Sequence, residues 1–275
     1  MAFIKRHALA IGIISMYAFT WPVYLSAAGR LPVRFPGFMY LVPGWGFVVA
    51  SILVTGLALG PRGVSELLKR YFMWRVGWIW YAALLIIPAV DLAGIFLHAA
   101  LTRTTPAFGS ARLVSIFGAS PNLVLFAIAT FVVEAIANGE EIGWRGYALP
   151  RLQSRYHALY SALVVGLVWS LWHIPLWINS WNPVAYTWYT AGVLAKSVFI
   201  TWIYNNTGGS LLVATLCHAT WNTLGSLLPL TSVVSNTDIG TLAVITLVEV
   251  AVAAVMTVAA GPVHLSRTRQ RQVQA

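Results

Sequence analysis

Long apolar runs alternate with short polar connectors along most of the chain. Eight of these runs are about 20 residues long, the length that an α-helix needs to cross the hydrocarbon core of a bilayer. They cover residues 8–28, 37–60, 77–100, 121–139, 158–179, 185–204, 209–230 and 238–261. Because every backbone N–H and C=O within lipid must be paired inside its own segment, we expect helices rather than strands. The pattern predicts an all-α, polytopic transmembrane helix bundle of about eight helices with a buried polar site.

Composition supports one integral membrane domain over residues 1–275. Hydrophobic residues make up 59% of the 275 residues and charged residues only 9%, whereas soluble domains average about 25% charged residues. So few charged side chains could not cover a soluble fold with water-facing groups. The motifs that contain the candidate catalytic residues lie within 121–230.

The formal net charge of +10 is distributed as membrane topology predicts. With the N-terminus in the cytoplasm and eight crossings, the cytoplasmic side carries 12 of the 17 Lys and Arg residues and the opposite side carries 4. This asymmetry follows the positive-inside rule and predicts a multi-pass protein of the cell membrane with both termini in the cytoplasm. The basic tail 264–272 would then lie near anionic headgroups, so we expect the lipid bilayer and not nucleic acid as its partner.

Two of the connectors between the apolar runs have a distinctive amino-acid composition. The segment 61–75 mixes leucines and aromatic residues with Lys and Arg, which predicts a helix lying along the cytoplasmic interface. The segment 101–120 is richer in Thr, Ser, Pro and Gly and predicts a partly ordered loop on the other side.

The strongest cluster of polar residues is NGEEIGWRGY, at 138–147. A titratable side chain at membrane depth is costly and therefore needs a partner or a role. In an α-helix Glu141 and Arg145 lie on the same face, one turn apart, while Glu140 points elsewhere. We therefore expect a Glu141–Arg145 ion pair that fixes the local structure and a free Glu140 that can act as a base; the alternative is an ordinary salt bridge at a helix end. Small residues that let another helix approach closely stand at Gly139, Gly143 and Gly146.

Two further pairs have the same one-turn spacing. Trp169 and His173 lie in the run 158–179, and His218 and Asn222 lie in the run 209–230. Each pair alone also fits ordinary packing, as a core histidine or an inter-helix hydrogen bond. Together, a carboxylate, two imidazoles and an amide can activate water and stabilise an oxyanion. The same groups could instead bind a divalent metal such as zinc, with Glu140, His173 and His218 as ligands.

The remaining polar residues at membrane depth have less specific interpretations. We expect Asp91, Glu134, Lys196 and Glu249 to form buried polar pairs, with a proton relay as the alternative. Cys217 is the only cysteine, which excludes an intramolecular disulfide and a multi-cysteine metal site. We interpret it as a small packing residue.

Taken in order, these motifs resemble those of the CPBP family of intramembrane proteases, which includes the type II CAAX prenyl proteases and the Abi-like bacteriocin-processing and self-immunity proteins. The family is marked by EExxxR, then an aromatic residue four positions before a histidine, then HxxxN. In this chain the motifs stand at Glu140, Glu141 and Arg145, at Trp169 and His173, and at His218 and Asn222. The aromatic position is commonly Phe in the family and is Trp here. The first 120 residues resemble the family only in hydropathy and in the basic connector.

The resemblance implies hydrolysis of a peptide bond within the membrane. The substrate would be a membrane-associated or C-terminal segment of a peptide or protein, with or without a lipid modification. Glu140 with His173 would activate the attacking water, His218 with Asn222 would stabilise the oxyanion, and the predicted ion pair would support the site. The family is often described as metalloendopeptidases, but no HExxH stands in this chain. A metal-dependent and a metal-free, glutamate-dependent mechanism therefore both stay open.

Two other classes of function are compatible with the sequence. A non-enzymatic immunity or scaffold protein could keep the polar cluster for packing. A transporter could use Asp91, Glu134 and Lys196 to line a path, although such proteins commonly contain internal repeats and none is visible here. Only a protease requires the side chains of Glu140, His173, His218 and Asn222 to converge on one water-accessible cavity; a scaffold needs no such opening.

Overall fold

The computed structural model describes residues 2–41, 44–118, 122–229 and 238–266, and all regular structure within these ranges is helical. The long helices are α1 (Ala2–Ala27), α3 (Trp45–Lys69), α5 (Ile86–Thr102), α7 (Leu123–Ala137), α9 (Ala158–Trp172), α11 (Pro183–Asn206), α12 (Leu211–Gly225) and α14 (Ile239–Ala260). The short elements are α2 (Gly37–Leu41), η1 (Arg70–Phe72), α4 (Trp78–Ala82), η2 (Ala83–Leu85), η3 (Phe108–Ser110), α6 (Arg112–Phe117), η4 (Ile142–Ala148), α8 (Leu149–Gln153) and α10 (Ile174–Trp177). Each predicted apolar run overlaps one long helix, and some also contain a short helical element, so the all-α prediction is confirmed.

Five stretches of the described chain are long and apolar enough to cross a membrane. They are Ala2–Ala27, Trp45–Phe72, Trp78–Thr102, Leu123–Gln153 and Ile239–Ala260. The other three predicted runs correspond to α9, α12 and α11. α9 is apolar but has only 15 residues, α12 also has 15 residues, and α11 has 24 residues but is not apolar enough. Length and composition thus support a polytopic bundle, with five rather than eight helices meeting the requirement for a full crossing.

The outer surface of the bundle is apolar, as a bilayer requires. On α7, Val124, Leu125 and Ile136 are 66%, 64% and 68% exposed, and on α14, Val255 and Val258 are 70% and 85% exposed. Soluble proteins rarely present such contiguous apolar faces to water. In lipid the same faces contact acyl chains, which makes the protein a multi-pass membrane protein.

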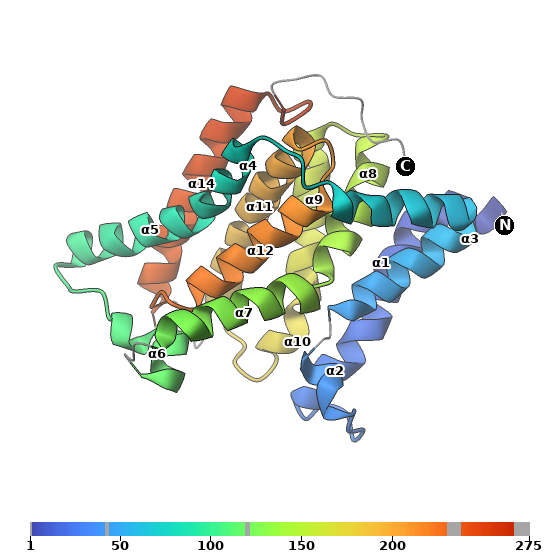
Figure 1. The fold of residues 1–275 in the computed structure, drawn as a ribbon. Helices are drawn as coiled ribbons and strands as arrows, with labels where there is room; N and C mark the ends of the chain where they lie inside the picture. Colours follow the sequence, from blue (N-terminus) through green and yellow to red (C-terminus); the bar gives the residue numbers. More distant parts are fainter. Residues whose placement is uncertain (1, 42–43, 119–121, 230–237, 267–275) are drawn as a thin grey trace.

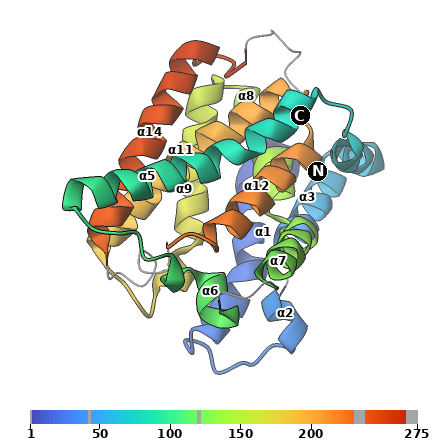
Figure 2. The same ribbon diagram turned by 60° about the vertical axis from the view of Figure 1, so that its left-hand side comes forward.

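The helices form two groups around a shared centre (Figure 1). α1 packs along α3 on one side of the bundle, and α5 packs against α14 on the opposite side. α11 lies between α9 and α14, and α12 contacts α7. In the view turned by 60°, α3 and α14 remain on opposite sides (Figure 2). The elements that carry the three motifs, η4, α9 and α12, therefore belong to the interior of the bundle.

Aromatic packing connects the α1–α3 group to this interior. The ring of Phe47 on α3 contacts the ring of Trp144 at 4.8 Å and the ring of Trp172 at 5.1 Å, both edge-on. The Trp172 indole N–H donates to Thr20 on α1 at 2.7 Å. Edge-to-face contacts of this kind add to the stabilisation from burial, and they hold η4 and α9 against α1 and α3.

The basic connector 61–75 is helical over most of its length. α3 breaks at Gly60, whose φ of 72° and ψ of −172° few other residues can adopt, and then resumes as far as Lys69. η1 extends the segment to Phe72. The predicted helix is confirmed, and the glycine break lets it turn away from the membrane-crossing part of α3.

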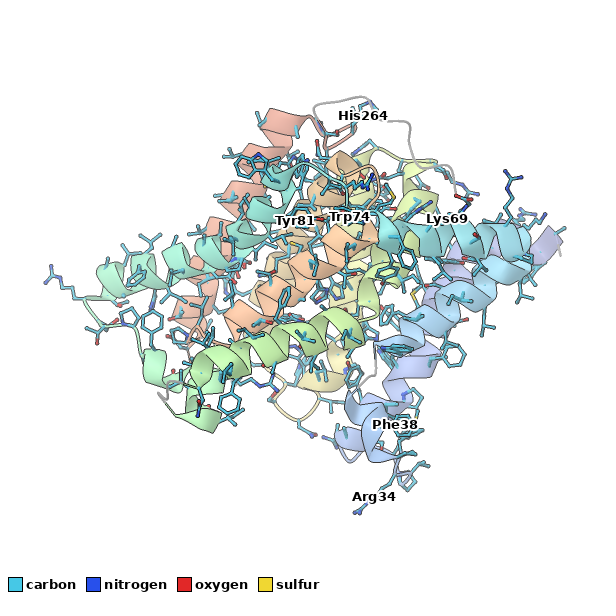
Figure 3. The ribbon with its side chains drawn as sticks, in the orientation of Figure 1. Arg34, Phe38, Lys69, Trp74, Tyr81 and His264 are labelled. Carbon is cyan, nitrogen blue, oxygen red and sulfur yellow. The ribbon has the colours of Figure 1, made fainter. Side chains whose placement is uncertain are left out.

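Residues that the topology predicts on opposite sides of the membrane lie toward opposite ends of the bundle. Lys69, Trp74, Tyr81 and His264 lie toward one end of the bundle, and Arg34 lies at the opposite end (Figure 3). The predicted loop 101–120 contains η3 and α6, while positions 119 and 120 lie outside the described residues. The basic tail beyond residue 266 also lies outside them. The cytoplasmic orientation of both termini stays a prediction.

Buried polar pairing is confirmed away from the motifs. Lys196 on α11 forms an ion pair with Glu249 on α14, and Asp91 on α5 lies close enough to Glu249 for their charges to interact. The ion pair joins α11 to α14, whereas neither carboxylate oxygen of Asp91 has a hydrogen-bond partner among the described residues. Cys217 is fully buried, in agreement with its interpretation as a packing residue.

Candidate active site

The segment that carries the acidic motif has an unexpected backbone. Residues Ile142–Ala148 form a π-helix, not the α-helix that the spacing predicts. π-helical turns are wider than α-helical turns and occur often at functional sites. Tight packing surrounds this one: a Cβ on Gly143 would lie 2.4 Å from the ring of Phe47, and a Cβ on Gly139 would lie 2.5 Å from the carbonyl oxygen of Gly44. The predicted close approach of another helix is confirmed, and that helix is α3.

Glu141 forms the predicted ion pair and also accepts a hydrogen bond from a histidine, which the sequence does not indicate. Its Oε1 accepts from Nη1 of Arg145 at 3.0 Å and from Nδ1 of His218 at 2.9 Å. Nη2 of Arg145 also donates to the hydroxyl of Ser197 at 3.3 Å. Glu141 and Arg145 have no exposed side-chain surface. Glu141 therefore connects the first motif to the third, through a bond between residues 77 positions apart.

Glu140 points away from this ion pair, as predicted, but it is not free. Its Oε2 accepts the indole N–H of Trp169 at 2.7 Å and that of Trp144 at 3.3 Å. Its backbone N–H donates to the side chain of Asn138 at 3.0 Å. The residue is 9% exposed, and its Oε1 has no hydrogen-bond partner among the described residues. One carboxylate oxygen is thus held in place while the other is available.

Trp169 contacts four of the other motif residues, which are Glu140, Arg145, His173 and His218. Besides its bond to Glu140, its carbonyl oxygen faces Nδ1 of His173 at 2.8 Å. The guanidinium of Arg145 lies over its ring at 5.1 Å, and the ring of His218 lies 5.2 Å away. From the sequence, position 169 could be recognised only as an aromatic residue of the motif, because the spacing of residues does not show where an indole N–H points.

The two histidines have defined tautomers. A backbone carbonyl and a carboxylate can only accept hydrogen bonds. Nδ1 of His173, beside the carbonyl of Trp169, therefore carries a proton, and so does Nδ1 of His218, beside Glu141. In each neutral ring the lone pair is then on Nε2. His173 is half-buried, whereas His218 is 2% exposed.

Asn222 is held by a partner from another helix. Its Nδ2 donates to Oε2 of Glu134 on α7 at 2.8 Å. The expectation of a polar pairing for Glu134 is confirmed, with Asn222 as the partner. The side chains of His218 and Asn222, predicted to act side by side, are thus bonded to two different carboxylates. The ring of Trp221 lies 5.6 Å from that of His218 and 6.0 Å from that of Trp169.

The predicted metal ligands do not form a metal-binding group. Within the described parts of the chain, no three His, Cys, Asp or Glu side chains are arranged to hold a metal ion. The three side chains are therefore not gathered around one point in this arrangement, and no step of the reaction is assigned to a metal. The zinc site at Glu140, His173 and His218 stays a prediction.

Comparison with known proteins supports the resemblance that the motifs indicate. Residues 120–224 match the family described as Rce1-like, the type II CAAX prenyl endopeptidases. The chain is also similar to a protein named CAAX prenyl protease 2 from Methanococcus maripaludis, with 32% identity over 156 residues, which are 54% of this chain and 55% of the relative. The chain thus matches about half the length of this curated relative. The predicted resemblance to the CPBP proteases is confirmed, and it covers every motif residue from Glu140 to Asn222.

Proposed function

We propose that this chain, whose residues 120–224 carry an Rce1-like domain, is an intramembrane endopeptidase. One observation carries the proposal: a nearly buried Glu140 has one carboxylate oxygen fixed by two indoles and the other without a partner among the described residues. Packing alone would not require a carboxylate at this position. Its neighbours, through Trp169, are two imidazoles, and groups of this kind are used to move the proton of an attacking water.

In the proposed reaction Glu140 acts as the general base. Its Oε1 removes a proton from water, and the water oxygen attacks the carbonyl carbon of the peptide bond. The lone pair on Nε2 of His173 accepts the second O–H of the water and orients it. When the tetrahedral intermediate collapses, the C–N bond breaks and the amine leaving group takes the proton from Glu140. The products are one amine and one carboxylic acid, which then releases its proton to bulk water and becomes a carboxylate.

The third motif would stabilise the negative charge on the tetrahedral oxygen. Asn222 uses one N–H for Glu134 and has a second N–H that can donate. His218 can donate from Nε2 when its ring is protonated, and the bond from Nδ1 to Glu141 favours that form. Donors held in place before the reaction are the usual means of oxyanion stabilisation. Glu141 thus acts through His218 and Arg145 and does not itself meet the substrate.

The substrate that we propose is a membrane-associated peptide with a cysteine near its C-terminus. The family description and the name of the relative refer to CAAX prenyl substrates. For this chain, a lipid modification of the substrate is part of the proposal. An apolar anchor would hold the peptide at the depth of the site and raise its local concentration.

The test is cleavage in vesicles that contain the purified protein. The probes are a fluorogenic peptide that ends in a Cys-aliphatic-aliphatic-X sequence, in farnesylated and unmodified forms. We expect cleavage of the farnesylated form, and His173→Ala should lower the rate by about 100-fold, the usual contribution of a positioned acid or base. Undiminished cleavage by His173→Ala would remove this residue from the mechanism.

A chelator added to the same assay tests the metal prediction. An unchanged rate is expected for the metal-free mechanism, whereas loss of activity that added zinc restores would favour the metal form. No cleavage of any probe by wild-type protein would favour the non-enzymatic scaffold.

Trp169→Phe should lower the cleavage rate by about 10-fold. The ring and its contacts with His218 and Arg145 are kept, but the N–H that fixes Oε2 of Glu140 is lost, and a hydrogen bond to a charged group contributes about 1.5–3 kcal/mol. The measurement is the rate in the vesicle assay. Trp144→Phe removes the longer of the two indole bonds and is the matched comparison, with a smaller expected loss. Equal rates for wild type and Trp169→Phe would show that this bond does not position the base.

A further inference from the structure

Two neighbouring cavities lie beside η4 and α8, away from the motif residues. One of about 400 Å³ is formed by the start of α1, the part of α3 before its break, α8 and the start of α9. The second, of about 240 Å³, lies under the connector helix that follows the break in α3. Both are lined by Leu59 and Arg151, so they are adjacent, and together they are here called the basic cleft.

The basic cleft carries an excess of positive charge. Its cationic side chains are Lys5, Arg6, Arg62, Arg70, Arg151 and Arg155. Its one acidic residue, Glu66, is exposed and paired with Lys69 at 2.9 Å. None of the six cations forms an ion pair with a carboxylate in the described chain. Glu66 lies close enough to Arg62 and Arg70 for their charges to interact, so one negative charge faces six positive ones, and this excess attracts an anion.

The two innermost cations contact only uncharged groups. Arg151 donates to the carbonyl oxygen of Tyr147 at 2.9 Å and lies over the ring of that residue at 3.8 Å. Arg70 donates to the hydroxyl of Tyr204 at 2.8 Å. Both side chains are therefore held in place, and each guanidinium keeps N–H groups for a further acceptor. Fixed guanidinium groups match the oxygens of a phosphate.

Apolar residues complete the lining of the larger cavity. Leu9, Leu59 and Val164 come from three different helices. The half-exposed rings of Tyr156 and Tyr160 lie beside Arg155 at its rim, at 48% and 46% exposure. Tyrosines of this kind are typical of the membrane–water interface. A ligand with an anionic head and apolar chains satisfies both parts of this surface.

We propose that the basic cleft binds the phosphate headgroup of an anionic phospholipid from the surrounding bilayer. The phosphate would lie among the arginines, and the acyl chains would follow the apolar lining toward the hydrocarbon core. Arg151 lies on α8, directly after the π-helix that carries Arg145 and packs against α3. A bound lipid would therefore stabilise the position of the π-helix. The proposal does not depend on the reaction that the protein catalyses.

The experiment measures lipid binding to the full chain in detergent micelles by native mass spectrometry. The probe is dioleoyl phosphatidylglycerol, and the variant combines Lys5→Gln, Arg6→Gln and Arg155→Gln, three exposed side chains. Each basic residue contributes about 1 kcal/mol to the attraction of an anionic lipid, so affinity should fall on the order of 100-fold. Arg155→Gln alone should lower it by about fivefold. This single exposed change keeps the test valid even if the triple variant folds poorly.

Three comparisons test whether the bound ligand is an anionic phospholipid and whether it binds in the basic cleft. The matched control combines Arg34→Gln, Arg103→Gln and Arg112→Gln, three exposed arginines outside the basic cleft, and should bind as wild type does. Dioleoyl phosphatidylcholine, which has no net charge, should bind far more weakly than phosphatidylglycerol. Inorganic phosphate should not displace the lipid. Equal loss in both triple variants, equal binding of the two lipids, or displacement by phosphate would each overturn the proposal.

Discussion

Glu140→Gln should lower the rate of peptide cleavage by about 100- to 10,000-fold, the range expected when a positioned general base is lost. The amide has the size of the carboxylate, and its oxygen can still accept the two indole N–H groups that hold Oε2. It cannot take a proton from water. We therefore expect a folded protein with almost no activity, measured as the cleavage rate in vesicles beside the thermal unfolding midpoint in detergent.

The control for this variant is Glu66→Gln, at an exposed carboxylate on the connector helix. It should cleave at the wild-type rate. An active Glu140→Gln protein would refute the assignment of the base. An inactive protein whose unfolding midpoint also collapses would show instead that Glu140 has a structural role.

Glu141→Ala should cost about 3–5 kcal/mol of unfolding free energy, the typical effect of breaking a buried ion pair from one side. The substitution leaves the fully buried Arg145 without a counter-charge and removes the acceptor of Nδ1 of His218. The substitution therefore removes the contact that joins the first motif to the third. Reversible unfolding in mixed micelles, monitored by circular dichroism, measures the effect.

Glu66→Ala offers the same chemical change at an exposed ion pair with Lys69 and should cost about 0–1 kcal/mol. Glu141→Gln should fall between the two alanine variants, because its side-chain oxygen can still accept from Arg145 and His218. Similar costs for the two alanine variants would contradict the account of Glu141 as the residue that joins the first and third motifs.

The helices could be predicted from the sequence because the bilayer imposes a simple rule on length and composition. A span must be about 20 residues long and apolar, and each of the eight runs became a helix. The Glu141–Arg145 ion pair could also be predicted, because side chains one turn apart lie close together on a helix. The pair survives in the π-helix because Arg145 is long enough to accommodate a wider turn.

Two parts of the site depend on tertiary structure and could not be predicted from spacing. The π-helix depends on packing against α3 at Gly139 and Gly143, and nothing local in 138–147 specifies it. The partners of His218 and Asn222 come from other helices, 77 and 88 positions away along the chain. Contacts between residues so far apart in the sequence leave no periodic pattern from which they could be predicted. The sequence could name these residues but not the bonds that orient them.

The central claim is that water activated by Glu140 hydrolyses a peptide bond at this site. The most direct measurement is cleavage of the farnesylated peptide in isotope-labelled water, with mass spectrometry of the new C-terminus. The account predicts one labelled oxygen in the product carboxylate of wild-type protein and no product above background from Glu140→Gln. Labelled product formed by Glu140→Gln at the wild-type rate would contradict it.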